Sequence, residues 1–233
     1  MANQSEFSDG NKSKAVAPAW IAAVLTGCVV PLLAVLVIAQ RSSPFATAGG
    51  PILTLSLMGI GILTAAIVGR FWVGVSLAIM NTAVVIVVAM ALDLLELPHP
   101  LSTGLAMVVA SCSFAARGAL FSKTLSERGW WMGLFVVLGE ASVLLIAFVF
   151  PGALPDWFLA LLPAQWASIA LKTALIGTGT VAAMPVLVAL AGTAATTLLA
   201  RRLWLKRWPY LLMFTTWLGL SALVYFSMSG GNL

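Results

Sequence analysis

Glu140 is the residue whose type and position point most clearly to chemistry. It is the one charged residue in an apolar run, residues 130–150, which opens with two tryptophans and is followed by Pro151. A helix rises about 1.5 Å per residue, so this run covers roughly the 30 Å hydrocarbon core of a bilayer. Glu140 then lies near mid-membrane, where an ionisable side chain is costly and is a candidate functional group.

Asn81 is a second polar candidate at a matching depth. Asn81 follows Trp72 by nine positions, as Glu140 follows Trp131, and nine residues span about 13 Å of helix. Hydrocarbon offers neither side chain a partner, so we expect the two to meet. The sequence predicts a hydrogen bond between Asn81 and a neutral Glu140. Glu140 is then either a packing residue or a group that takes up and releases a proton, and both interpretations stay open.

Lys172 and a nearby run of small residues complete the candidates. We expect Lys172 at the outer interface, with its stem buried and its ammonium in water. A deeper position, in which it approaches Glu140 as an ion pair, is the alternative. The small-residue run predicts either a packing face, which we favour, or a discontinuous helix that lines a site. The residues of this possible break are Gly177, Thr178, Gly179, Thr180 and Pro185.

The chain lacks the motifs of common catalytic sites. His99 is its only histidine, which excludes bis-histidine haem and multi-histidine metal centres. Cys28 and Cys112 lie far apart in apolar runs and are expected to be buried packing residues. The signatures of nucleotide-binding loops, zinc proteases and serine hydrolases do not occur. The sequence predicts no metal and no cofactor, and it favours a protein that is not an enzyme.

Composition sets the class of protein. Hydrophobic residues make up 61% of the 233 residues and charged residues 8%, whereas a soluble domain is about a quarter charged. We therefore expect an all-α polytopic transmembrane bundle. The net charge of +5 does not indicate nucleic-acid binding, because the basic residues are spread along the chain.

Hydropathy divides the chain into about seven spans. Residues 1–14 form a polar tail, residues 15–228 a single transmembrane helical domain, and residues 229–233 a short outer tail. Residues 164–200 would make a helix of about 55 Å, so this stretch either begins outside the membrane or breaks. Residues 151–163 are too short and proline-rich to cross, and we expect them to lie along the outer interface.

Charge predicts the orientation. A cytoplasmic N-terminus leaves only Arg41 and Lys172 on the outer side and agrees with the positive-inside rule. Arg117, near the end of its span, is then expected to extend to the cytoplasmic interface. The basic residues assigned to the cytoplasmic side are Lys12, Lys14, Arg70, Arg117, Lys123, Arg128, Arg201, Arg202, Lys206 and Arg207. A multi-pass protein of a bacterial plasma membrane is the expected setting.

Two functional classes fit this pattern. The favoured one is a subunit, assembly factor or scaffold of a larger membrane complex, because polar residues at mid-depth are few. Its expected partners are lipid and other membrane chains or further copies of itself. The alternative is a small proton-coupled transporter or channel, in which Glu140 carries the proton. Lys172, Asn81 and residues 177–180 would then line a path.

Overall fold

The computed structural model describes residues 17–41, 45–125, 128–177, 179–203 and 208–229. Within these ranges the chain is helical and has no strand, and seven helices are long and apolar enough to cross a membrane. This confirms the predicted all-α, polytopic bundle. The tail 1–14, residues 230–233, Thr178, Lys206 and Arg207 lie outside the described ranges.

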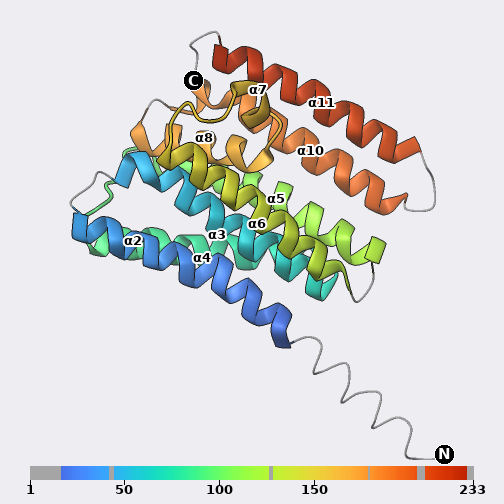
Figure 1. Cartoon of the computed structure of the whole chain (residues 1–233), viewed down its shortest axis with the longest axis horizontal. Helices are drawn as coiled ribbons and strands as arrows, with labels where there is room; N and C mark the ends of the chain where they lie inside the picture. The colour runs from blue at the N-terminus through green and yellow to red at the C-terminus, as the bar shows by residue number, and fades with distance from the viewer. Residues whose placement is uncertain (1–16, 42–44, 126–127, 178, 204–207, 230–233) are drawn as a thin grey trace, which may run out of the picture.

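In the described ranges, seven long helices and three short ones follow one another (Figure 1). The first span, Ala17–Gln40, contains a π-helical turn, η1 (Leu25–Val29), and most of α2 (Val30–Arg41). The other long helices are α3 (Phe45–Val68), α4 (Phe71–Ala91), α5 (Pro100–Leu125), α6 (Gly129–Val149), α10 (Met184–Arg202) and α11 (Trp208–Ser229). The short ones are α7 (Asp156–Leu159), α8 (Pro163–Ile176) and α9 (Gly179–Ala182).

Helix α3 is the centre of the bundle. About 72% of the residues in its most apolar 18-residue stretch are buried, against 11% in that of α11. Helix α3 packs against α4, α5, α6 and α8. Small residues permit this packing: a Cβ added to Gly118 of α5 would lie 2.1 Å from the carbonyl oxygen of Ile62 in α3. In Figure 1 α2 and α4 lie on one side of the bundle, and α10 and α11 lie on the other.

The two ends of the bundle are identified by close contacts. At the first, which we call the Gly69 end, the carbonyl of Gly69 accepts a hydrogen bond from Arg201 Nη2 at 2.8 Å. Ser122, near the end of α5, also lies there, against Gly69. At the second, the Pro98 end, Gly177 lies against Pro98 and His99. Helix α6 begins beside Ser122 at the Gly69 end and therefore finishes at the Pro98 end.

Residues 150–176, which we call the re-entrant segment, enter the bundle and leave it at the same end. They start at the Pro98 end, where α6 finishes, and reach mid-height at Leu161, whose carbonyl accepts from Trp217 Nε1 at 3.1 Å. Trp217 lies near the middle of α11. Helix α8 then returns over 14 residues, about 21 Å, to the Pro98 end.

The expectation that residues 151–163 lie along the interface is therefore wrong for Leu161, which lies at mid-height of the bundle. Proline and short length do exclude a crossing, but they do not keep a segment at the surface. Inside an apolar bundle, irregular backbone is tolerated where protein groups take up its hydrogen bonds. Trp217 and Glu140 do so here, because they bond the carbonyl of Leu161 and the N–H of Ala164.

Candidate functional site

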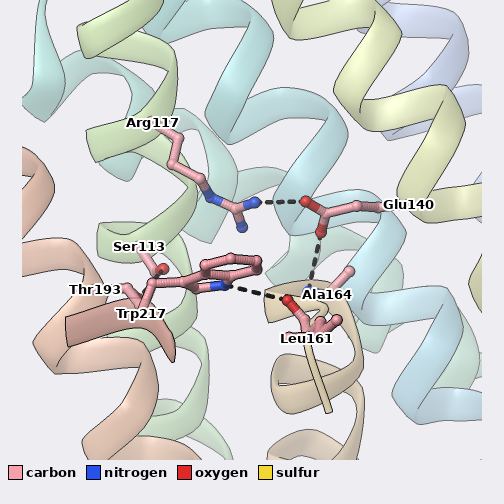
Figure 2. Close-up of polar contacts among 7 residues, drawn as sticks. All are labelled: Ser113, Arg117, Glu140, Leu161, Ala164, Thr193 and Trp217. Carbon is pink, nitrogen blue, oxygen red and sulfur yellow. Dashed lines mark hydrogen bonds and ion pairs between the residues drawn. The ribbon is translucent and has the colours of Figure 1, made fainter. Parts of the chain in front are cut away.

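An ion pair between Arg117 and Glu140 forms the centre of the candidate site (Figure 2). Arg117 Nη1 donates to Glu140 Oε1 at 2.6 Å, and the two side chains are 16% and 11% exposed. Arg117 comes from α5 and Glu140 from near the middle of α6. A charge-assisted hydrogen bond of this length is strong. Because both side chains are largely shielded from water, each charge is stabilised mainly by the other.

Glu140 also holds the start of α8. Its second oxygen, Oε2, accepts from the backbone N–H of Ala164 at 3.0 Å. The first N–H groups of a helix lack partners within the helix, and the helix dipole favours a negative charge there. Pro163 occupies the preceding position, where its missing N–H has no cost. The carboxylate thus joins the re-entrant segment to the ion pair.

Arg117 retains two hydrogen-bond donors that Glu140 does not use. Its Nε and Nη2 atoms are buried, and the described residues offer them no hydrogen-bond partner. The ring of Phe114 lies 4.9 Å from the guanidinium carbon and covers one face of the group. Buried donors without partners are rare in folded proteins and call for an explanation.

Polar groups from two further helices lie beside this pair. Ser113, one helical turn before Arg117, has its hydroxyl oxygen 3.2 Å from that of Thr193 in α10. Trp217 of α11 extends in Figure 2 across the space between Arg117 and Leu161. The site therefore combines groups from α5, α6, α8, α10 and α11, all near the middle of the bundle.

The predicted hydrogen bond between Glu140 and Asn81 is wrong. Asn81 Nδ2 donates to the carbonyl of Gly27 and to Ser56 Oγ, both at 2.7 Å. Pro31 lacks the N–H that would bond the Gly27 carbonyl in a regular α-helix, and the amide of Asn81 supplies a donor instead. Asn81 and Glu140 match in depth, but they lie on α4 and α6, which pack against α3 rather than closely against each other. The two residues therefore face different neighbours.

The expectation that Arg117 extends to an interface is also wrong. Its guanidinium turns to Glu140, which it reaches because α5 and α6 form a hairpin. Arg117 lies 11 residues before Arg128, and Glu140 lies 11 residues after Gly129. The two backbone positions are nevertheless at different heights: Gly118 and Gly133 both lie against Ile62, so Glu140 is seven residues, about 10 Å, further along α6 than the level of Arg117. The long side chain of Arg117 covers this difference, so the spacing in the sequence did not predict the pair. The sequence predicted a neutral Glu140 that donates a hydrogen bond. In the structure its two oxygens instead accept hydrogen bonds from Arg117 and from the N–H of Ala164.

The remaining candidates lie towards the Pro98 end. Lys172 is exposed on α8, and its Cβ lies near Gly50 of α3. Helix α8 ends at Gly177, whose φ of +86° is the left-handed conformation that favours glycine. Thr180 pairs with Ser102 at 2.9 Å, and Pro185 opens α10. The helix therefore breaks at Gly177, and that this break lines a site stays a prediction.

A cavity of about 400 Å³ lies beside the C-terminal end of α8, lined by Ala46, Leu175 and residues 94–98. Helix α8 therefore runs from this cavity to the ion pair. No group of three or more metal-binding side chains occurs among the described residues. No protein-family model, curated protein or solved structure matches this chain.

Proposed function

We propose that this chain is a small proton-coupled transporter whose central site is the Arg117–Glu140 pair. One observation carries the proposal: a re-entrant half-helix, α8, begins at a charged pair at mid-height of the bundle. Discontinuous helices whose ends face polar groups near the bilayer midplane are a recurring design of secondary transporters. A scaffold has no need of such a costly group.

Glu140 is the group that we assign to the proton. The guanidinium of Arg117 keeps its charge at all physiological pH values, so only Glu140 can change the charge of the pair. Protonation of Glu140 weakens the ion pair and leaves Arg117 Nη1 available. Other titratable groups on the helices packed against α6 are few: α3 carries none, α5 adds Cys112 and Lys123, and α8 adds Lys172.

The setting that we propose is a plasma membrane with the N-terminus in the cytoplasm. Supporting this is the excess of arginine and lysine at the Gly69 end, where Arg70, Lys123, Arg128 and Arg201 lie. The Pro98 end, with its cavity and Glu96, then faces outwards. A solute would enter beside α8 and meet the ion pair at mid-depth.

Proton movement in liposomes tests this function. The purified chain, reconstituted with an entrapped pH-sensitive dye, receives gradients of lactate, glycine, glucose or choline in turn. We expect one solute class to move protons faster than in protein-free liposomes, and Glu140→Gln to abolish this movement while it assembles normally. Arg202→Gln, an exposed cation of α10, is the matched control and should behave like wild type. If no class moves protons, the transport proposal fails.

The second candidate is a subunit or scaffold of a membrane complex, with other membrane chains or further copies as partners. The wide apolar faces of α6 and α11 support it, because only 17% and 11% of the residues in their most apolar stretches are buried within the bundle. Lipid alone can cover such faces. A partner chain that co-purifies in stoichiometric amount in mild detergent, together with no proton movement, would favour this candidate.

A further inference from the structure

The unused donors of Arg117 lie on one edge of its guanidinium. In a planar guanidinium the N–H of Nε and one N–H of Nη2 point the same way and form a two-donor fork. Nη1 is bonded to Glu140, and Phe114 covers one face, so the Nε–Nη2 edge is left for a further partner. Such a fork matches the two oxygens of a carboxylate.

We propose that Arg117 binds the carboxylate group of the transported solute through its Nε–Nη2 edge. The inference rests on the proposed transport function and names its substrate class. Glu140 meets the guanidinium at Nη1 only, and no described residue bonds Nε or Nη2. The hydroxyls of Ser113 and Thr193 lie beside Arg117 and bond each other. Thr193 also donates to the carbonyl of Leu190, so this side of the site is polar but uncharged. The described part of α10 and α11 brings no charged group to this side except near the Gly69 end.

Charge balance selects a monocarboxylate that arrives with one proton. Arg117 and Glu140 sum to zero, so a single bound carboxylate would leave one net negative charge in a medium of low dielectric. A proton on Glu140 restores neutrality, because Arg117 then pairs with the solute instead. A cation would meet the guanidinium without compensation, and a neutral solute would leave the fork without a charged acceptor. Transport of the carboxylate and the proton is thereby coupled one to one.

Binding of lactate to the purified chain tests this assignment. Lactamide has nearly the same shape without the charge, and inorganic phosphate presents the other common oxyanion. We expect lactate to raise the thermal unfolding midpoint in a saturable manner, with lactamide and phosphate without effect. Arg117→Lys keeps the charge but loses the fork, and it should weaken lactate binding at least about tenfold, since one charge-assisted hydrogen bond is lost. Arg202→Lys, at an exposed position, should bind lactate like wild type.

The outcomes separate the two proposals. Equal binding of lactate and lactamide, or unchanged binding in Arg117→Lys, overturns the carboxylate assignment. Phosphate binding without lactate binding also overturns it. If choline or glucose moves protons through the liposomes while lactate neither binds nor moves them, transport stands and the carboxylate inference fails. Should Arg117→Lys not survive purification, the comparison of lactate with lactamide on the wild-type chain decides alone.

Discussion

Replacing Arg117 by leucine should lower the free energy of unfolding by about 3–5 kcal/mol, the usual cost of leaving one member of a buried ion pair alone. Glu140 would remain 11% exposed without the guanidinium that now lies 2.6 Å away. Unfolding in mixed detergent micelles, followed by circular dichroism, measures the change. The exposed Arg202, replaced by leucine, is the matched control and should shift stability by no more than about 0.5 kcal/mol.

A double variant separates the ion pair from simple loss of a side chain. Leucine at both Arg117 and Glu140 removes the uncompensated charge, so most of the lost stability should return. The hydrogen bond from Ala164 to Glu140 is lost in this variant, so recovery will be incomplete. If the double variant is as unstable as the sum of the two single variants, the two side chains do not act as a pair.

Gly118→Ala should be the most damaging single methyl addition in α5. The new Cβ would lie 2.1 Å from the Ile62 carbonyl oxygen, so the backbones of α3 and α5 must separate. Overpacking of this kind costs about 1–3 kcal/mol, and more where backbone cannot yield. Because Gly118 follows Arg117, the shift should also weaken the contact with Glu140, and proton movement should fall with stability.

Gly104→Ala on the same helix is the control for Gly118→Ala. No atom lies within 4 Å of a Cβ added to Gly104, so the added methyl group meets open space. Alanine forms helices better than glycine by about 1 kcal/mol, so this variant should be neutral or slightly more stable. Thermal unfolding of both variants under one condition measures the difference. Equal stabilities would show that α3 and α5 do not pack as closely as described.

The spans could be predicted from the sequence because hydropathy reports directly on the surrounding solvent. The course of residues 150–176 could not, because length and proline content exclude a crossing without saying where the backbone finds its partners. Those partners, Trp217 and Glu140, belong to helices distant in the chain. A helix break near Gly177 was one of two alternatives from the sequence, and the left-handed backbone there shows the break but not whether it lines a site.

The candidate site was predictable in part. Glu140 stood out because its apolar run has no other charge, but its partner was misassigned. Position along a helix fixes depth, whereas the side that a residue faces depends on the order in which helices pack. Asn81 matched Glu140 in depth and faces Gly27 and Ser56 instead. Arg117 was attributed to an interface because lysine and arginine usually extend there, whereas its long side chain extends along the bundle to Glu140.

The depth of Leu161 in a bilayer tests the central claim most directly, because the transport site exists only if the re-entrant segment reaches mid-membrane. A nitroxide on a cysteine at Leu161, with Cys28 and Cys112 replaced by alanine, reports depth by its accessibility to oxygen and to a polar relaxation agent. We predict that the label at Leu161 reports the same depth as a label at Leu218, which lies beside Trp217 near the middle of α11. A headgroup depth, matching a label at the exposed Trp157, would contradict the account.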